Sequence, residues 1–580
     1  KKESIYKFIA YFEKLIFWFD DNLDTKIKDL SFDEDVKEEI LSQYQIFECV
    51  HFDLRDELLN NLDSNPILLK HGQNNYTISD IFHGANNIFK NLKQKQIDFK
   101  NEILIAMDNS YELLCLIICL WYSEIPYTVI DNKTPNNRIM EMLQITGSST
   151  IICDNSFADV IQKFEDFNVT ILVLDALFET VGSKITDNNL ELVDHYKYFR
   201  TTDSKVYTIF TSGTSGIPKA VEINLQNLNS YLYGIMSRVV LEKNLKFLWH
   251  STLVTDFGYT TLLLSLSTGG CLILPDEKYD LLNSSKFLNL IKTEQIDFLK
   301  ITPSYFQALY MGNQVTECSY LPRVVLMFGG EELSSKILSY LNSIENRGFC
   351  IFNHYGPTET TIGVIAGEIS DFSKNNKVPI GIPLNGVGTL LLNQYGYSVP
   401  PGALGYLHIF GPQVGKYTSH SESFYQKDLG NDKIITIYNT GDLVRQNDNG
   451  EFIFYGRNDN QTKIRGYRVE LEEINKVIEH EDEVIDCRTI LYQNNFYSFI
   501  KIAKQISDLD SYVNEWNKVY DYSYKNNKEA SLFNISGWKS SYTHEVLPKQ
   551  QMLNWRNAII QKVLNNKNVD SILEIGCGFG

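Results

Sequence analysis

Short apolar runs alternate with longer segments of helical periodicity from about residue 50 to residue 455. This alternation constrains the fold more than any other feature of the sequence. A buried strand followed by a crossover helix produces it, and continuous apolar strands are typical of parallel sheets that are covered on both faces. The alternation therefore predicts a large α/β body. Its strands are expected at NEILIAM (101–107), STIIC (149–153), VTILVL (169–174), CLILP (271–275) and RVVLMFGG (323–330).

Length and charge limit the possible functions. The 580 residues suffice for about four domains of ~150 residues each. With 53 Lys and Arg against 72 Asp and Glu, the net charge of −19 argues against nucleic acid or an anionic membrane as the principal partner. The nine cysteines form no CxxC pair, which favours reduced thiols and a cytoplasmic location. No segment reaches the ~20 uncharged apolar residues of a membrane-spanning helix, and no signal peptide is visible.

The strongest short motif is YTIFTSGTSGIPKAV, in which an apolar strand runs into a loop rich in glycine and hydroxyl side chains. Glycines let the backbone turn its N–H groups inward, hydroxyls add donors, and Lys219 supplies a mobile positive charge, as a triphosphate requires. The spacing differs from GxxxxGK[ST], so this is no P-loop NTPase. Taken alone, the motif fits a polar surface loop equally well. The loop residues are Thr211, Ser212, Gly213, Thr214, Ser215 and Gly216.

Three further motifs follow in order: NHYGPTETT (353–361), YNTGDL (438–443) and GRNDNQTKIRGYRVELEEI (456–474). With the glycine-rich loop, they make the chain resemble an adenylation domain of a nonribosomal peptide synthetase, in the adenylate-forming superfamily. The resemblance covers roughly residues 50–505, with NYTISDI and YTVIDNKTPNNRI also in place. It implies an α/β fold with a large adenylate-forming core and a truncated α+β lid.

The resemblance implies roles in ATP and Mg²⁺ binding. The loop from Thr211 to Lys219 would hold the β- and γ-phosphates of ATP, and Tyr355 would stack on adenine. Thr358 would bond the α-phosphate, and Glu359 would supply a carboxylate to Mg²⁺ while the substrate carboxylate attacks. The other nucleotide positions that the resemblance implies are Gly329, Gly330, Glu331, Asn353 and Gly356.

The later motifs would bind ribose and move the lid. Asp442 would accept hydrogen bonds from both ribose hydroxyls, with Arg457 nearby, and Asp459 would be the hinge about which the lid rotates. As an alternative, Asp442 and Glu359 are turn residues on a solvated surface. The sequence departs from the family pattern, without losing a group of known chemical role, at Ala220, Tyr406 and residues 472–475.

The substrate pocket of this family lies between VTDFGYT and HYGPTETTIG. Asp256 matches the aspartate that pairs with the substrate α-ammonium, which points to an α-amino acid. The other matching positions are Phe257, Thr260, Lys300, Met327, Gly329, His354, Ile362 and Gly363.

Lys300 is the most informative pocket position. A buried ammonium is costly unless it is paired, and Asp256 should already be occupied by the ligand, so the substrate is expected to bring the counter-charge. His354 adds a donor and Gly329 leaves room, and the set resembles the pattern associated with aspartate. We therefore predict L-aspartate; asparagine, glutamate and a β-substituted aspartate are alternatives. In a further alternative, Lys300 extends to solvent and selects nothing.

The C-terminal stretch does not continue the lid pattern. It resembles the lead-in of methyltransferase domains that interrupt peptide-synthetase adenylation domains, and a helix is expected at QQMLNWRNAIIQKVL. The final SILEIGCGFG, an apolar strand followed by Glu574, Gly576 and Gly578, then fits the S-adenosylmethionine loop of a Rossmann-like class I methyltransferase. A dinucleotide-binding GxGxxG is the alternative. The resemblance implies N-methylation of the carrier-bound aminoacyl thioester, with a carbon or oxygen acceptor left open.

The sequence thus predicts a module fragment in four parts. Residues 1–50 would end an upstream condensation-type domain or linker, 51–458 would form the adenylation core, 459–505 the start of its lid, and 506–580 the start of an inserted methyltransferase. The chain begins with Lys and stops inside a motif, so we expect a piece of a longer polypeptide. The N-terminal residues carry apolar side chains at helical spacing and are expected to pack on the upstream domain.

The implied partners are an amino acid, ATP, a condensation domain and a carrier domain with a phosphopantetheine arm. Because the lid lysine and the carrier lie outside the chain, we expect weak binding and poor turnover. Two other classes remain open. A stand-alone acyl-CoA synthetase-like ligase is disfavoured by Asp256 and the methyltransferase lead-in, and a non-catalytic scaffold module is disfavoured by the intact loop, Glu359 and Asp442.

Overall fold

A computed structural model gives the fold. It describes residues 9, 12, 33–44, 52–98, 100–131, 133–155, 157, 169–174, 191–199, 203–211, 218–275, 283–315, 317–344, 348–370, 377–418, 423–430, 433–458, 461–464, 467–481, 483–492, 495–502 and 548–564.

One β-sheet has seven strands in the order β18-β8-β7-β4-β3-β5-β6. β3, β4, β5, β6 and β7 pair in parallel, whereas β8 runs antiparallel to β7 and to β18. Every residue of β3, β4 and β5 is buried, as a parallel sheet covered on both faces requires. The strands are β3 (Ile103–Ala106), β4 (Tyr127–Ile130), β5 (Thr150–Cys153), β6 (Thr170–Val173), β7 (Lys205–Thr211), β8 (Lys219–Asn224) and β18 (Lys416–Tyr417).

The second sheet has fourteen strands. Its central strands β13, β12, β11, β9, β10 and β1 pair in parallel, and β2 ends it antiparallel to β1. Beyond β13 the sheet continues antiparallel through β14, β15, β21, β20 and β17 to β16, with β19 paired to β20. The parallel strands are β1 (Ile67–His71), β9 (Lys246–Leu248), β10 (Cys271–Leu274), β11 (Phe298–Ile301), β12 (Val325–Gly329) and β13 (Cys350–Tyr355). The others are β2 (Asn74–Thr77), β14 (Ile365–Glu368), β15 (Pro379–Pro383), β16 (Gly388–Leu392), β17 (Leu404–Phe410), β19 (Phe424–Asp428), β20 (Ile434–Gln446) and β21 (Phe452–Arg457).

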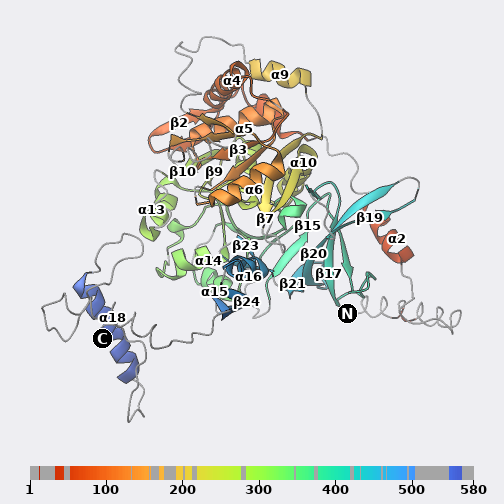
Figure 1. The fold of residues 1–580 in the computed structure, drawn as a ribbon, viewed down its shortest axis with the longest axis vertical. Helices are drawn as coiled ribbons and strands as arrows, with labels where there is room; N and C mark the ends of the chain where they lie inside the picture. The colour runs from red at the N-terminus through yellow and green to blue at the C-terminus, as the bar shows by residue number, and fades with distance from the viewer. Residues whose placement is uncertain are drawn as a thin grey trace. The chain divides into compact units, whose positions relative to one another are not determined.

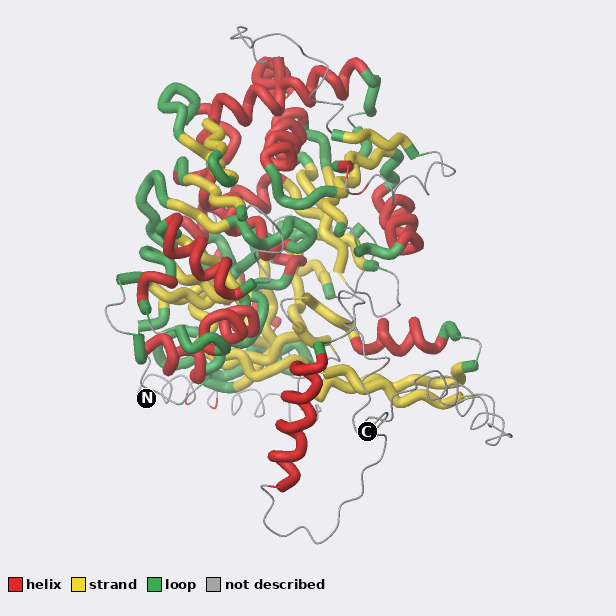
Figure 2. The backbone as a smooth tube through the Cα atoms, turned by 90° about the vertical axis from the view of Figure 1, so that its left-hand side faces the viewer, coloured by secondary structure: helices red, strands yellow, loops and turns green. Residues whose placement is uncertain are grey.

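Helices cover the strands (Figures 1 and 2), and several begin at capping side chains. Thr77 and Asp80 form a capping box on α4, and Asn224 and Asn227 form one on α10, so local sequence fixes both starts. The helices are α3 (Leu54–Asn60), α4 (Ile78–Gln94), α5 (Tyr111–Ser123), α6 (Asn136–Thr146), α9 (Glu191–Phe199), α10 (Leu225–Arg238), α11 (Tyr259–Thr268), α13 (Ser284–Glu294), α14 (Pro303–Phe306) and α15 (Ser335–Asn342). Single turns are η4 (Asp256–Gly258), η5 (Gln307–Met311), η6 (Cys318–Tyr320) and η7 (Thr358–Thr360).

Helix α2 (Asp33–Tyr44) packs on the antiparallel end of the large sheet, beside β19 in Figure 1. Val36 and Ile40 are buried there against apolar side chains of β16, β17 and β20. The Gln43 side chain also pairs with the backbone of Thr389, accepting from its N–H over 2.9 Å and donating to its carbonyl over 3.0 Å. This part of the predicted linker therefore packs directly on the predicted adenylation core.

The described chain divides into two compact units, residues 1–480 with 488–499 and residues 481–487 with 500–580. The first unit contains the elements of the predicted lid that precede residue 480. These are β22 (Gln461–Ile464), β23 (Tyr467–Glu470) and α16 (Leu471–Glu479). β24 (Val484–Tyr492) and β25 (Asn495–Ile502) follow as a two-stranded sheet, and α18 (Lys549–Leu564) belongs to the second unit.

The predicted α/β fold is confirmed. All five apolar runs form strands, β3, β5, β6, β10 and β12, and α18 lies where a helix was expected. The terminal SILEIGCGFG strand lies outside the described residues, as does nearly all of the predicted N-terminal helix. The four domain boundaries stay predictions. Among the described helices, none combines the length and apolar character needed to cross a membrane.

Candidate active site

Several of the predicted substrate and nucleotide residues lie at the carboxyl ends of the parallel strands of the large sheet. Lys300 lies on β11 and pairs in register with Met327 of β12, and Gly329 of β12 pairs with His354 of β13. Asp256 and its neighbours come from η4 and the start of α11. Open α/β sheets bind ligands outside this edge, so topology gathers side chains that are far apart in sequence.

Gly329 lies against two of the predicted pocket side chains. A Cβ at this position would lie 3.5 Å from Cε of Lys300 and 3.6 Å from Cε2 of Phe257, against which any larger side chain would press. The glycine therefore leaves the space in front of these two side chains open. That Gly329 provides room for the substrate stays a prediction.

The Lys300 side chain is buried, with only 2% of its surface exposed. Its ammonium donates to Thr260 Oγ1 over 2.8 Å and to the carbonyl oxygen of Phe257 over 3.2 Å. It also lies 4.3 Å from the centroid of the Phe257 ring, in the geometry of a cation–π contact. Lys300 does not extend to solvent, so the alternative that predicted solvent exposure is wrong.

His250 fixes the backbone of Lys300. Its Nε2–H donates to the Lys300 carbonyl oxygen over 2.8 Å. Burial lowers the pKa of His250 to about 4, so the imidazole is neutral near pH 7. Strand β11 thus presents Lys300 from a fixed backbone position.

Tyr231 was missed by the sequence reasoning. This residue of α10 is fully buried, and its hydroxyl lies 2.7 Å from Thr260 Oγ1 and 3.5 Å from His354 Nε2. It is one of many aromatic residues on amphipathic helices, and no motif surrounds it. Only the fold shows that its hydroxyl reaches the pocket.

The loop after η7 is strained. Thr361 and Ile362 are β-branched and have φ angles of 61° and 64°, which such residues rarely adopt. A hydrogen bond of 2.6 Å from the N–H of Gly363 to the carbonyl of Thr361 closes a three-residue turn centred on Ile362. Thr361 Oγ1 donates to the carbonyl of Gln413 over 2.6 Å, which anchors the loop.

Gly363 lies directly under His354. A Cβ added to Gly363 would approach Nε2 of His354 to 2.0 Å, which no packing can accommodate without displacing the ring. The strained turn therefore sets both the position of Gly363 and the space that the imidazole occupies. Gly363 therefore limits the position of the His354 ring, and the prediction that Ile362 and Gly363 line the substrate pocket stays a prediction.

A cavity of about 410 Å³ lies beside this pocket, and its size is within the usual range for ligand sites. Predicted nucleotide residues line much of it, together with side chains of β15, β21 and β22. The predicted members of the lining are Gly330, Glu331, Asn353, His354, Tyr355, Gly356, Asp442 and Arg457.

Tyr355 and Asp442 are joined at this cavity. The Tyr355 hydroxyl donates to one carboxylate oxygen of Asp442, and Arg457 donates to the other. Burial and the adjacent Asp442 carboxylate raise the pKa of Tyr355 well above its ordinary value, so the phenol stays protonated. Asp442 is only 4% exposed, which rules out the alternative of a turn residue on a solvated surface.

A chain of polar contacts continues from this pair to the start of the predicted lid. Arg457 donates to the Gln461 side chain over 2.8 Å, and Gln461 donates to Glu470 over 2.9 Å. Gln461 was not predicted as a site residue, although it lies within the GRNDNQTKIRGYRVELEEI motif. The sequence pattern marked the segment but not this contact.

Two predicted nucleotide residues also stabilise the strand edge. Both carboxylate oxygens of Glu331 accept hydrogen bonds of 2.9 Å from the backbone N–H and the hydroxyl of Ser304, near the start of α14. The amide of Asn353 donates to the carbonyl of Pro379 over 2.8 Å. Through these contacts both residues stabilise the strand edge, and both also line the cavity.

The predicted metal ligand Glu359 is fully buried. The hydroxyl of Tyr417 donates to its carboxylate, and the Tyr417 ring lies 5.9 Å from Nζ of the predicted phosphate-binding Lys219. The backbone carbonyl of Glu359 accepts from Gly415 over 2.9 Å. Burial also excludes the solvated-turn alternative for Glu359, and it places Tyr417, which was not predicted, between a carboxylate and a lysine.

Several predicted residues are not tested by geometry. Thr211 is buried and its hydroxyl donates to the carbonyl of Lys219 over 3.5 Å, and Thr358 lies in η7. The remaining members lie outside the described residues, namely Ser212, Gly213, Thr214, Ser215, Gly216, Asp459, Glu574, Gly576 and Gly578. Among the described residues, no cluster of three His, Cys, Asp or Glu side chains has metal-binding geometry.

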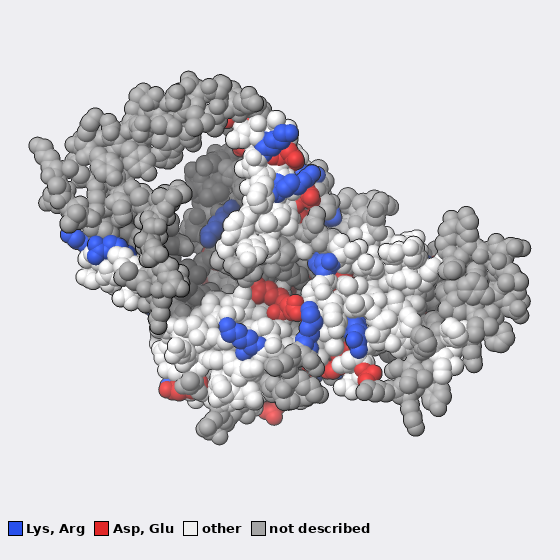
Figure 3. Space-filling model, turned by 90° about the horizontal axis from the view of Figure 1, so that it is seen from below, with Lys and Arg blue, Asp and Glu red and all other residues white. Residues whose placement is uncertain are grey.

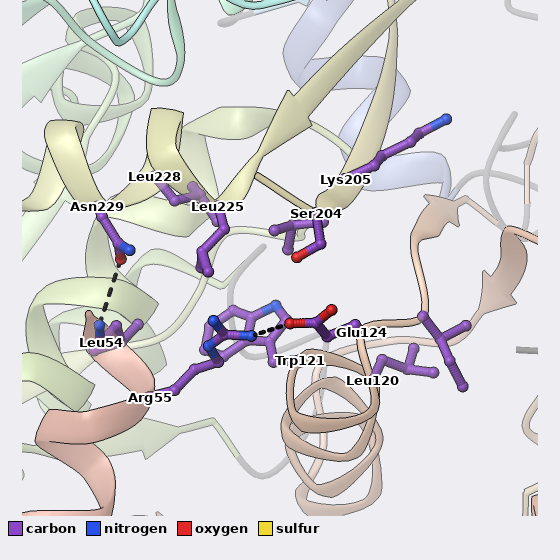
Figure 4. A pocket seen from close by; sticks show the side chains of 12 residues that line it. Leu54, Arg55, Leu120, Trp121, Glu124, Ser204, Lys205, Leu225, Leu228 and Asn229 are labelled. Carbon is purple, nitrogen blue, oxygen red and sulfur yellow. Dashed lines mark hydrogen bonds and ion pairs between the residues drawn. The ribbon is translucent and has the colours of Figure 1, made fainter. Parts of the chain in front are cut away.

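Two further cavities contain none of the predicted site residues. One of about 680 Å³ lies on the antiparallel end of the large sheet and is rich in tyrosine; Tyr406, a departure from the family pattern, is among its lining residues. The other, drawn in Figure 4, has only about 20 Å³, space for about one water. There Arg55 points at Glu124 across 3.0 Å and also pairs with Asp53, so this is a buried ion-pair cluster of the scaffold.

Surface charge is mixed in the view of Figure 3. Basic and acidic side chains of the described residues are interspersed on that face, so the net charge of −19 does not gather there into one acidic patch.

Comparison with known proteins identifies the family. A model of the family described as AMP-binding enzyme matches residues 60–417. Surfactin synthase subunit 2 of Bacillus subtilis is 30% identical over 421 residues, which are 71% of this chain and 11% of that protein. Chondramide synthase cmdD of Chondromyces crocatus is 26% identical over 536 residues, or 87% of this chain and 13% of that protein.

Solved structures share the fold. A Vibrio cholerae adenylation domain, AlmE, in complex with glycyl-adenosine-5′-phosphate superimposes with a TM-score of 0.67 at 21% identity, covering 79% of this chain and 91% of AlmE. The o-succinylbenzoate CoA synthetase of Bacillus subtilis gives a TM-score of 0.66 at 18% identity, covering 78% and 89%.

The chain belongs to the AMP-binding enzyme family. Within that family it is similar to the adenylation domains of nonribosomal peptide synthetases. It spans only 5% to 17% of the length of the curated synthetases that it matches.

Proposed function

We propose that this chain carries an adenylation domain that activates L-aspartate with ATP and Mg²⁺ for loading onto a carrier protein. The observation that carries the choice of substrate is the burial of Lys300 at the carboxyl edge of the large sheet. A buried ammonium strongly favours the binding of an anionic ligand, because burying a positive charge without a counter-charge costs free energy.

The pocket geometry supports a short acidic side chain. Phe257 and Thr260 hold the Lys300 ammonium, and Gly329 keeps the space in front of it open. Asp256, at the start of η4, would pair with the substrate α-ammonium, so the ligand would meet opposite charges at its two ends. A neutral amide in place of the carboxylate would leave the lysine charge less well compensated.

The nucleotide would occupy the cavity of about 410 Å³. Tyr355 offers an aromatic face, and Asp442, buried and already accepting two hydrogen bonds, offers a carboxylate for the ribose hydroxyls. Thr211, Lys219 and the intervening loop would hold the phosphates. The α-phosphorus would then lie near the amino-acid carboxylate, between the nucleotide cavity and the predicted substrate pocket.

The residues present fit a magnesium ion. Mg²⁺ is usually held by one or two protein carboxylates, waters and substrate phosphates, so the single buried carboxylate of Glu359 suffices. When bound, the ion would supply positive charge that reduces the repulsion between the phosphates and the attacking carboxylate. Tyr417 would orient Glu359, and Lys219 would add a second positive charge on the other side of the Tyr417 ring.

The neighbouring domains are proposals from sequence. A condensation domain and a carrier domain with a phosphopantetheine arm fit the synthetases that the chain resembles. The inserted methyltransferase rests on the sequence motif of Glu574, Gly576 and Gly578. We propose S-adenosylmethionine as its cofactor and the amino nitrogen of the loaded residue as its acceptor.

The family fold also supports CoA ligases, as the o-succinylbenzoate CoA synthetase shows. Asp256 favours an α-amino acid over an acid that lacks an amino group. The two activities are separated by substrate chemistry rather than by fold.

Direct binding tests the proposal on the 580-residue chain. Non-hydrolysable aminoacyl-sulfamoyl adenosines that carry each of several side chains are titrated in a calorimeter, with adenosine monophosphate as reference. The aspartyl analogue should bind tightest, and ATP–pyrophosphate exchange should follow the same order. Tightest binding of a large apolar side chain would overturn the assignment of aspartate, and equal binding of a deaminated analogue would overturn amino-acid activation.

A further inference from the structure

A chain of four buried polar side chains runs behind the predicted substrate pocket. Lys300 Nζ lies 2.8 Å from Thr260 Oγ1, Thr260 Oγ1 lies 2.7 Å from the Tyr231 hydroxyl, and that hydroxyl lies 3.5 Å from His354 Nε2. The members come from β11, α11, α10 and β13, which are distant in sequence. Tyr231 is the only one of the four that the family pattern does not place in the pocket.

Burial makes these contacts matter. Tyr231 and Thr260 are fully buried, and Lys300 and His354 are 2% and 3% exposed. Solvent compensates poorly for a lost hydrogen bond at this depth, so each contact in the chain contributes to the position of its two side chains. Burial also raises the pKa of the Tyr231 phenol, so the hydroxyl hydrogen is retained near pH 7.

The direction of one hydrogen bond in this chain is fixed by the chemistry of Lys300. The Lys300 ammonium can only donate, so Thr260 Oγ1 accepts from it. In the Thr260–Tyr231 contact either hydroxyl can donate, and in one arrangement Thr260 donates to the Tyr231 oxygen and Tyr231 donates to Nε2 of His354. This order uses each hydroxyl hydrogen once and leaves the imidazole of His354 as the acceptor of the last bond.

We propose that Tyr231 is a positioning residue for substrate selection. Its hydroxyl holds Thr260 and His354 in the orientation in which Lys300 and His354 can both bind one acidic side chain of the substrate. The inference rests on the proposed aspartate activation and adds a residue to it. Without the phenol hydroxyl, Thr260 loses a partner and is free to rotate away from Lys300. His354 loses one of the contacts that hold its ring above Gly363.

A positioning role and a purely structural role of Tyr231 lead to different expected binding results. A structural role predicts that loss of the hydroxyl lowers stability and weakens all ligands alike. A positioning role predicts a selective loss for the ligand with an acidic side chain, because only that ligand uses the aligned Lys300 and His354.

The test uses the 580-residue chain with Tyr231→Phe, which keeps the ring and its packing. Tyr233→Phe on the same helix, where the side chain is 42% exposed, is the matched control. Calorimetry measures binding of the aspartyl- and asparaginyl-sulfamoyl adenosines and of adenosine monophosphate. Tyr231→Phe should weaken the aspartyl analogue about tenfold and narrow its advantage over the asparaginyl analogue, with monophosphate binding unchanged.

A second pair of variants distinguishes a selective loss of binding from misfolding of Tyr231→Phe. Thr260→Val breaks the same chain at the next residue and should reproduce the selective loss, whereas Thr260→Ser keeps the hydroxyl and should restore most of the discrimination. An equal loss for all three ligands, or no loss, in both Tyr231→Phe and Thr260→Val overturns the positioning role. Failure of the unmodified chain to prefer the aspartyl analogue would overturn the proposed substrate itself, and this inference with it.

Discussion

The hydroxyl of Tyr355 donates to the carboxylate of Asp442, which links an aromatic face at the end of β13 to an acid on β20. Arg457 holds the same carboxylate from β21. The Asp442 carboxylate is therefore oriented before any nucleotide arrives, and a ribose would meet a preformed acceptor.

Asp442→Asn should weaken nucleotide binding. The substitution removes a charged acceptor that ribose hydroxyls would use, and hydrogen bonds to charged groups contribute about 1.5–3 kcal/mol. We expect at least a tenfold higher dissociation constant for adenosine monophosphate by calorimetry. Asp448→Asn makes the same chemical change at an exposed position in the β20–β21 turn and should bind normally. Equal affinity of both variants would remove Asp442 from the nucleotide site.

Tyr417→Phe should weaken the response to magnesium. The variant keeps the ring beside Lys219 but loses the hydrogen bond that orients Glu359. ATP binding measured against Mg²⁺ concentration should need about three- to tenfold more metal for half-saturation, in line with about 1 kcal/mol for one hydrogen bond. Tyr425→Phe, whose hydroxyl contacts His408 instead, is the control. Superimposable magnesium curves for the two variants would contradict the role of Tyr417.

Lys300→Ala should abolish discrimination between acidic and amide side chains. The substrate carboxylate would then be buried without its charge partner, which costs more than the loss of a neutral contact. We expect the aspartyl analogue to lose about a hundredfold in affinity and the asparaginyl analogue less than tenfold. Lys292→Ala on α13 removes a surface lysine that pairs with Glu317, and it should leave both values unchanged. If the ratio of the two affinities is unchanged in Lys300→Ala, another group of the pocket discriminates between the two side chains.

Gly363→Ala should destabilise the pocket. The added methyl group would lie 2.0 Å from Nε2 of His354, and such overpacking typically costs about 1–3 kcal/mol. Denaturant titration should show this loss together with weaker binding of the aspartyl analogue. Gly348→Ala, where a Cβ meets no atom within 4 Å, should be neutral in both measurements. A stable Gly363→Ala with normal binding would show that the imidazole can move freely.

Stability should fall as the pH drops from about 6.5 to about 4, in part because of His408. Burial lowers the pKa of His408 to about 4 from its ordinary 6.5, so the unfolded chain takes up a proton that the folded chain refuses in this window. The contribution is fully present above pH 6.5 and amounts to roughly 3 kcal/mol, lost by pH 4. Thermal unfolding of the native chain and His408→Gln should therefore converge as the pH falls. Parallel pH curves would contradict this assignment.

The strands of the scaffold could be predicted from the sequence, because its short apolar runs are typical of buried strands. NEILIAM and RVVLMFGG became β3 and β12, and the motif residues Tyr355, Asp442 and Arg457 met at one cavity. The resemblance could not supply Tyr231 or Tyr417, since each contributes one hydroxyl to a partner far away in the chain. Nor could it supply the positive φ of Ile362, because a β-branched residue normally avoids that conformation.

The strained turn centred on Ile362 has a consequence for attempts to change the substrate. Its two backbone outliers cost about 1–3 kcal/mol each, and neighbours such as Gln413 hold them in place. Glu359 lies just ahead of the turn and Gly363 just behind it, so the proposed metal ligand and the proposed selectivity pocket share one stretch of strained backbone. A substitution that relaxes this stretch to admit a new amino acid would shift the carboxylate as well. Redesign of the proposed pocket should therefore begin at Thr260 or Lys300, which lie on a regular helix and a regular strand, because a substitution there would leave the backbone of Glu359 in place.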